Sequence, residues 1–216
     1  MPNYTWNYIS ANPDTIVKMK KKYYASEERP FDFNKLVPMP ESLDVESGSS
    51  NDLDIYYYLS EKLSIPVEEM KKHSLTMLLL SNHFSTEWID EIYKRIVKRI
   101  KAGEYPNYET GRTLVDNWKK YGAKTWYEWC NKNWGTKWNA FEVCWNENSI
   151  EFTTAWRAPE PIFKKMCEDF PGSELLFTCE YEEGYTAIYE EQNGKLKFIK
   201  CEENYDPEED DDAAAG

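Results

Sequence analysis

The chain has 216 residues, of which 41% are hydrophobic and 16% aromatic, so it holds enough apolar material for one sizeable core or two small ones. Its 39 acidic and 26 basic residues give a net charge of −13, which argues against non-specific binding to nucleic-acid phosphates or to an anionic membrane surface. The acidic residues concentrate at the C-terminus, where the last fifteen residues hold eight of them and no Lys or Arg.

Two features indicate a cytoplasmic protein. The sequence contains no apolar run near the ~18 residues of a membrane span, and its first residues do not have the basic and then apolar pattern of a signal peptide. The five cysteines are odd in number and lack a CxxC pair, which is typical of reduced thiols rather than of disulfides or a zinc site. We expect these cysteines to fill the core.

The chain opens with a predicted strand and helix. Residues 3–10 place an aromatic side chain at every second position, the period of a half-buried strand. The aromatic side of this strand holds Tyr4, Trp6 and Tyr8. Asn12 and Pro13 then form a helix start, and apolar residues at helical spacing continue to about residue 24.

Residues 51–134 have helical patterns throughout. A Ser- and Gly-containing joint at residues 46–51 precedes them, and several helices follow one another along the segment. Gly122 and Gly135 are expected to end the last two helices in the left-handed conformation.

The pattern changes after Trp138. The sequence predicts a hairpin over residues 141–156, a helix over 159–170, a strand over 175–181 and a second hairpin over 186–201 with a tight Asn-Gly turn.

Without the helical middle, the order is strand, helix, strand, strand, helix, strand. This order predicts an α+β fold, a ferredoxin-like βαββαβ sandwich with a helical insertion after the first helix and an added C-terminal β-hairpin. We expect a discontinuous core of residues 1–50 and 135–201, an insertion of 51–134 packed on it, and a disordered acidic tail of 202–216. Two independent domains would leave the first strand and helix without partners.

A tryptophan cluster is the most unusual feature, since seven of the nine tryptophans fall between residues 118 and 156. It forms either an aromatic platform that binds a partner or a packed corner where the insertion meets the sheet. The acidic tail is either a solvated terminus or a polyanion that occupies a basic groove. The candidate partner-binding residues are Trp126, Trp129, Trp134, Lys137, Trp138, Glu208, Glu209, Asp210, Asp211 and Asp212.

The sequence carries no catalytic signature. Residues 134–138 contain Gly, Thr and Lys but lack the spacing of a phosphate-binding loop. His73 and His83 are ten residues apart and have no third ligand at metal-binding spacing. We therefore predict a protein that is not an enzyme and has no cofactor or metal, although scattered carboxylates of a hydrolase could still meet in the fold.

Three segments resemble a known family. They are residues 1–7 (MPNYTWN), 31–43 (FDFNKLVPMPESL) and 121–139 (YGAKTWYEWCNKNWGTKWN). These segments are similar to phage and plasmid proteins with a YubB-like (Api-type) ferredoxin-like domain, over roughly residues 1–43 and 105–192. The resemblance implies the same fold and an origin in a mobile genetic element, and it brings no catalytic residues.

The leading hypothesis is a non-enzymatic binding protein that contacts a host protein in the host-cell cytoplasm. Its acidic surface suits a nucleic-acid-binding partner, such as a host defence nuclease, as an inhibitor or nucleic-acid mimic. The alternative is a module that binds single-stranded nucleic acid through aromatic residues of the sheet. The negative charge and the lack of an RNA-recognition motif oppose that alternative.

Overall fold

The computed structural model describes residues 3–48, 50–70 and 86–203, and the chain divides into two compact units. The sheet unit comprises residues 1–38 and 130–216, and the helical unit comprises residues 39–129. Relative to the expected boundaries, residues 39–50 join the helical unit and residues 130–134 join the sheet unit. The packing of the insertion on the core stays a prediction.

Local contacts explain where the two units divide. Leu43, in the short helix η2 (Glu41–Leu43), is buried, and the Asn117 amide donates to the Ser42 carbonyl oxygen at 2.6 Å. In the sheet unit, the Trp134 indole N–H donates to the Val37 carbonyl oxygen at 2.8 Å. Each segment therefore belongs to the unit that satisfies its buried groups.

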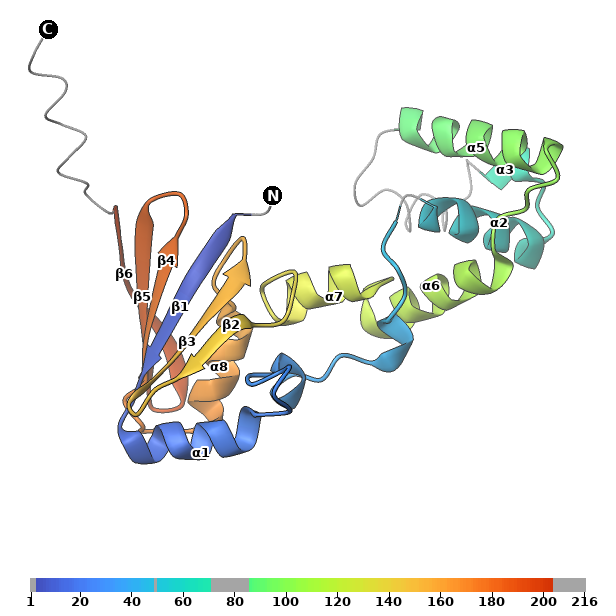
Figure 1. The fold of residues 1–216 in the computed structure, drawn as a ribbon. Helices are drawn as coiled ribbons and strands as arrows, with labels where there is room; N and C mark the ends of the chain where they lie inside the picture. Colours follow the sequence, from blue (N-terminus) through green and yellow to red (C-terminus); the bar gives the residue numbers. More distant parts are fainter. Residues whose placement is uncertain (1–2, 49, 71–85, 204–216) are drawn as a thin grey trace, which may run out of the picture. The chain divides into compact units, whose positions relative to one another are not determined.

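Six antiparallel strands form one sheet in the order β2-β3-β1-β4-β5-β6 (Figure 1). The strands are β1 (Tyr4–Ser10), β2 (Phe141–Trp145), β3 (Ser149–Ala155), β4 (Leu176–Tyr181), β5 (Tyr185–Gln192) and β6 (Lys195–Glu203). The first four have the spatial order of a ferredoxin-like sandwich, and the β5–β6 hairpin extends the sheet beyond β4. The predicted fold class is confirmed.

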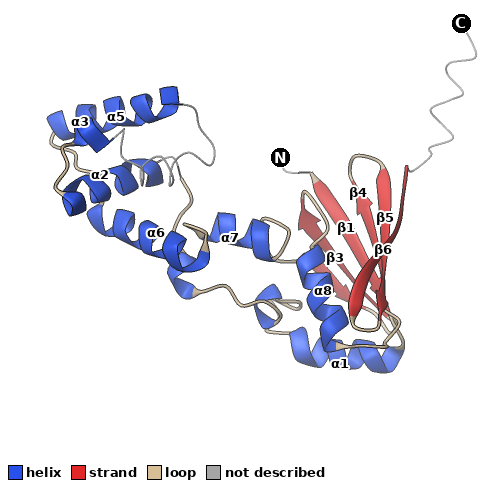
Figure 2. Cartoon of the chain, turned by 180° about the vertical axis from the view of Figure 1, so that it is seen from behind, coloured by secondary structure: helices blue, strands red, loops and turns tan. Residues whose placement is uncertain are grey.

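Helices α1 (Pro13–Tyr23) and α8 (Glu160–Asp169) supply the helical layer, and Figure 2 shows α8 lying against the sheet. The Asn12 side chain caps α1 by accepting from the Thr15 N–H at 2.9 Å, as the sequence predicts. The Tyr23 hydroxyl at the end of α1 donates to Asp169 at the end of α8, at 2.9 Å. The two helices are therefore joined at their C-terminal ends.

Strand β1 is correctly predicted, but its aromatic side is not the buried one. Thr5, Asn7 and Ile9 are buried, whereas Trp6 is 47% exposed and Tyr8 is 39% exposed. The buried side of the sheet already receives large side chains from the helices and neighbouring strands, so β1 contributes smaller ones there. The buried Asn7 amide donates to the Thr154 hydroxyl at 2.9 Å.

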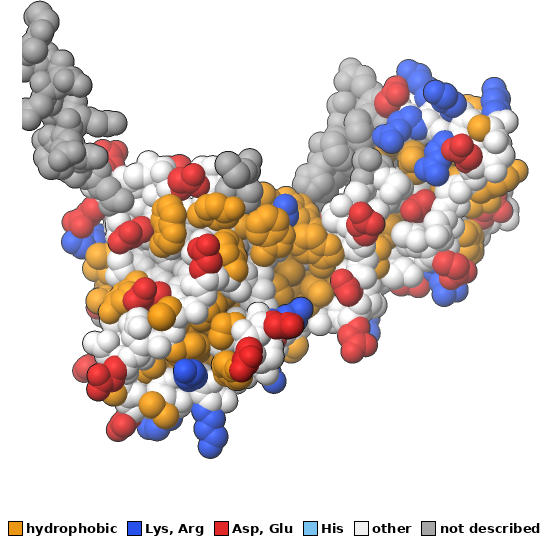
Figure 3. All heavy atoms as spheres, viewed as in Figure 1, with side chains coloured by type: hydrophobic (Ala, Val, Ile, Leu, Met, Phe, Trp, Pro, Cys, Tyr) orange, Lys and Arg blue, Asp and Glu red, His pale blue; other side chains and the backbone are white. Residues whose placement is uncertain are grey.

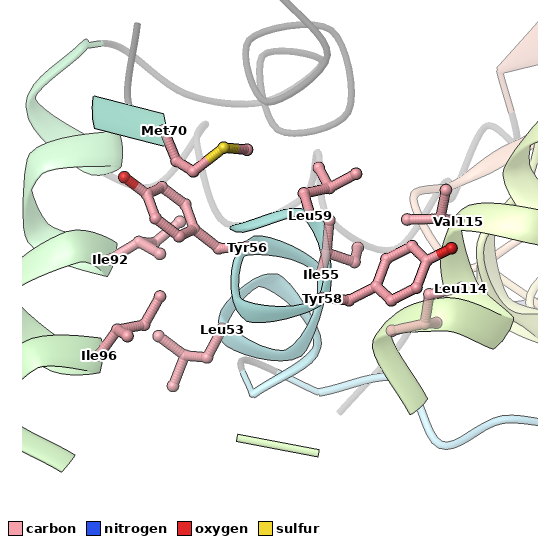
Figure 4. Packing of buried hydrophobic residues seen from close by; sticks show 10 residues of the cluster. All are labelled: Leu53, Ile55, Tyr56, Tyr58, Leu59, Met70, Ile92, Ile96, Leu114 and Val115. Carbon is pink, nitrogen blue, oxygen red and sulfur yellow. The ribbon is translucent and has the colours of Figure 1, made fainter. Parts of the chain in front are cut away.

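The helical unit packs around α2 (Asn51–Leu63) (Figure 4). The other helices are α3 (Val67–Met70), α5 (Thr86–Lys101), α6 (Tyr108–Tyr121) and α7 (Trp126–Asn133), whose last residues pass into the sheet unit. Tyr56 on α2 lies toward Ile92 of α5, and Tyr58 lies toward Leu114 of α6.

Helices α2 and α6 approach closely at Gly111. A Cβ atom at Gly111 would lie 2.1 Å from the carbonyl oxygen of Asp54, so any larger side chain would force the helices apart. The Asp54 carboxylate also accepts from the Asn107 N–H at the start of α6, at 2.7 Å.

Two smaller expectations are corrected. Cys130, Cys167 and Cys179 are buried as expected, but Cys144 and Cys201 are exposed because they lie on the outer strands β2 and β6. Strand β6 continues to Glu203, two residues into the predicted tail, because Glu202 and Glu203 pair with β5. His73, His83 and the five acidic candidates Glu208 to Asp212 lie outside the described residues.

Candidate binding face

The sheet has one exposed face, which we call the open face: the side opposite the face buried against α1 and α8. Strand β1 runs through its centre, because β3 and β4 flank β1 on either side. Figure 3 shows hydrophobic and acidic side chains interspersed over the surface of the sheet unit. On β1 the open-face residues are the aromatic ones, Tyr4, Trp6 and Tyr8, which alternate with the buried Thr5, Asn7 and Ile9.

The strand register surrounds Trp6 and Tyr8 with polar side chains. Trp6 lies opposite Thr153 on β3 and Glu180 on β4. Tyr8 lies opposite Glu151 on β3 and Thr178 on β4. Together with Glu142 from β2, these residues line a hollow of about 480 Å³. The hollow is therefore a direct product of the pairing of four strands.

The carboxylates of the hollow are held in place by neighbours on the sheet. Glu142 has a positive φ of 52° within the irregular part of β2, and its carboxylate accepts from the Thr153 hydroxyl at 2.9 Å. Thr153 itself is buried at the base of the hollow. The Glu151 carboxylate accepts from the Asn146 amide at 2.7 Å. Two of the three carboxylates are thus oriented by hydrogen bonds rather than by cations.

Two lysines of β6 near this face are paired with other carboxylates. Lys200 lies 2.7 Å from the Glu202 carboxylate, and Lys197 lies 4.0 Å from that of Glu190. Across residues 3–48, 50–70 and 86–203, no Lys or Arg forms an ion pair with Glu142, Glu151 or Glu180. The hollow therefore combines an aromatic wall with uncompensated negative charge.

This arrangement suits an organic cation. An exposed indole attracts a cation to its face, and carboxylates around it accept hydrogen bonds from N–H donors. The acidic side chains surround the hollow without converging: within the described part of the chain, no group of three His, Cys, Asp or Glu residues is placed to hold a metal ion.

Burial makes two of the thiols poor nucleophiles. It raises the pKa of Cys130 and of Cys167 to about 12, with the Glu191 carboxylate adding to the effect at Cys167. Thiols with such pKa values are protonated at neutral pH, and the thiolate is the reactive form. These two cysteines therefore have a packing role.

The structure separates the predicted tryptophan candidates into buried and exposed ones. Trp129 and Trp134 are buried, and the Trp134 ring lies 5.7 Å from that of Phe33. Trp126 is half-buried. Trp138 is 39% exposed, and the Lys137 ammonium lies 4.4 Å from the centre of its ring. The role of these residues in partner binding stays a prediction.

The open-face residues Trp6, Glu142, Glu151 and Glu180 are not among the binding residues that the sequence predicts. The sequence of this strand allows Trp6 to be exposed. The other side of the strand carries Ile9, so that side could equally have been the buried one. The three glutamates come from three different strands. Only the strand order brings them to one hollow, and no local pattern reveals that.

The C-terminal part of the chain is similar to a known protein family. Residues 133–215 match the family model of the ferredoxin-like domain in Api92-like protein. The matched range includes β2 to β6 and α8, whereas β1 and α1 come from residues outside the match. The resemblance to Api-type ferredoxin-like domains is confirmed over this range. The origin in a phage or plasmid stays a prediction.

The other comparisons with known proteins give no information on activity. A search of the curated proteins finds no match. The crystal structure of a protein api92 from Yersinia pseudotuberculosis is similar to 95% of this chain and 99% of that chain, with 13% sequence identity and a TM-score of 0.39. The description of the Api92-like domain names a fold and no activity.

None of the described helices combines the length and the apolar character needed to cross a bilayer.

Proposed function

We propose that this protein is a non-enzymatic binding protein whose open face contacts a basic surface of a protein partner. The observation that supports this proposal is the exposed Trp6 among the carboxylates of Glu142, Glu151 and Glu180. Exposed aromatic side chains supply much of the binding energy in protein interfaces, and complementary charge supplies rate and specificity. A nucleic-acid-binding host protein fits this description, because its phosphate-binding groove is basic.

The alternative, binding of single-stranded nucleic acid, also draws on the open face. RNA-recognition domains stack bases on aromatic residues of the central strands of a similar sheet, and β1 is such a strand here. However, a bound strand would bring its phosphates close to three carboxylates, and the whole chain has a net charge of −13. Charge therefore favours the protein partner.

The test compares ligands of opposite charge on the full chain. We expect a labelled peptide rich in Arg and Lys to bind with an affinity that falls as salt rises, and a single-stranded RNA of similar length not to bind. The triple variant Glu142→Gln/Glu151→Gln/Glu180→Gln should bind the peptide about tenfold more weakly, or worse, at low salt.

The matched control removes the same charge elsewhere. Glu27, Glu28 and Glu147 are exposed and do not line the hollow, so their triple replacement by Gln changes the net charge equally. Equal weakening by both triple variants would show that only net charge matters and would contradict the proposal. Salt-sensitive binding of the RNA by the unmodified chain would support the nucleic-acid alternative instead.

A further inference from the structure

We propose that the hollow beside Trp6 takes the side chain of an arginine from the partner. This inference rests on the proposed function and narrows it to one chemical group at one position. It depends on three properties of the hollow: a free indole face, several separately oriented acceptors and the absence of a competing cation.

The indole of Trp6 is available for stacking. It is 47% exposed, and within the described residues no ring–ring or cation–π contact involves it. Trp is the strongest cation-binding ring, and the planar guanidinium of Arg lies flat on it more readily than the ammonium of Lys does. The indole therefore favours arginine.

The acceptors of the hollow match the donors of a guanidinium. A guanidinium has five N–H donors in a fixed plane, and it bonds best to acceptors at its edges. Glu180 approaches Trp6 from β4, while Glu142 and Glu151 lie on the β2 and β3 side. A guanidinium on the indole would thus have carboxylates on two sides.

A lysine would use the same site less well. Its ammonium is a compact, strongly hydrated charge that must lose more water to enter a half-buried hollow. Its three donors also cannot extend to acceptors on both sides of the ring in one plane. The structure therefore predicts a preference for arginine over lysine, in addition to a preference for positive charge.

The test uses two peptides of identical length and charge, one with arginine and one with lysine at every basic position. Calorimetry on the full chain should give an affinity for the arginine peptide at least about fivefold higher. In Trp6→Ala the ratio of the two affinities should fall to about one, with the protein still folded. Glu180→Gln, which leaves the indole in place, should weaken the binding of both peptides.

Trp138→Ala is the matched control, since Trp138 is also partly exposed and does not line the hollow. It should keep the full preference for arginine. Loss of the preference in Trp138→Ala and not in Trp6→Ala would move the site to the tryptophan cluster and overturn the inference.

The remaining outcomes separate this inference from the proposed function. Equal, salt-dependent binding of both peptides would refute the arginine site while leaving the basic partner in place. Binding of neither peptide would refute both. Sedimentation could instead show a dimer, and a separate measurement could show that Trp6 is protected from solvent in that dimer. A second copy of the chain would then occupy the hollow, which also contradicts the inference.

Discussion

The two faces of the sheet use the same strands in opposite ways. On β1, the helix side carries Thr5, Asn7 and Ile9, whereas the open side carries Tyr4, Trp6 and Tyr8. The large side chains of the helix side come instead from other elements, among them Phe163 of α8 and Phe177 of β4. Aromatic residues of this sheet therefore belong to the core on one face and to the candidate binding surface on the other.

The same division appears in the acidic residues. On the helix side, Glu191 and Asp169 are surrounded by donors that satisfy their carboxylates. On the open side, Glu180 has no cation partner among the described residues. Carboxylates of the first kind stabilise the fold, and those of the second kind remain available to a ligand.

The largest expected difference in unfolding free energy is between substitutions at two neighbouring residues of β4. Phe177 is fully buried with its ring 4.6 Å from that of Phe163, whereas Leu176 is 41% exposed on the open side. Phe177→Ala should lower the free energy of unfolding by about 3–5 kcal/mol, and Leu176→Ala by less than about 1 kcal/mol. Chemical denaturation measures both, and similar losses would contradict the assignment of the two faces.

The next largest loss of stability is expected at Asp169, which links helices α1 and α8. Asp169 accepts from the Tyr23 hydroxyl, and its carboxylate lies 2.8 Å from the Lys22 ammonium and 2.7 Å from that of Lys165. Asp169→Asn should cost about 1–3 kcal/mol of unfolding free energy, because three donors lose a charged acceptor. The control Glu168→Gln, at an exposed residue 3.6 Å from Lys165, should cost little.

Acid should remove the contribution of Asp169 to the free energy of unfolding. Burial acts to raise its pKa, but hydrogen bonds from Lys165, Lys22 and Tyr23 outweigh burial and hold the pKa below the ordinary 3.8. A carboxyl with a lowered pKa in the folded state stabilises fully above its unfolded pKa, and the contribution is lost as pH falls through the folded value. The stability difference between the unmodified chain and Asp169→Asn should therefore shrink below about pH 4. A difference that stays constant there would contradict this account.

A smaller effect distinguishes two adjacent glutamates of β5. The buried Glu191 carboxylate accepts from the backbone N–H groups of Gly194 at 2.7 Å, Gly172 at 3.0 Å and Glu174 at 3.2 Å. Glu191→Gln should cost about 1–2 kcal/mol, measured by urea unfolding, because a charged acceptor of three N–H groups becomes neutral. Glu190→Gln, one residue along on the open side, should leave the unfolding midpoint almost unchanged.

Much of the fold could be predicted from the sequence because its signals are local. The Asn12 and Pro13 helix start, the Asn193 and Gly194 turn and the two hairpins each depend on neighbouring residues, and each is present in the structure. The helix that ends at Gly122 is also present, with Gly122 in the left-handed conformation.

The candidate site could not be predicted in the same way. Alternation identifies a strand but not which of its sides is buried, so the exposure of Trp6 followed only from the packing of α1 and α8. The approach of Glu142, Glu151 and Glu180 depends on residues nearly 40 positions apart in the chain. The tryptophan cluster drew attention because it is dense in sequence, although Trp129 and Trp134 are buried.

The most direct test of the open face is an NMR titration of the full chain with the arginine-rich peptide. The proposed function predicts saturable shifts of the Trp6 indole N–H and of backbone amides on β1, β3 and β4, with the amides of α1 and α8 unchanged. Shifts confined to Trp126–Trp138 or to residues 204–216, with the Trp6 indole unmoved, would show that the open face is not the binding surface.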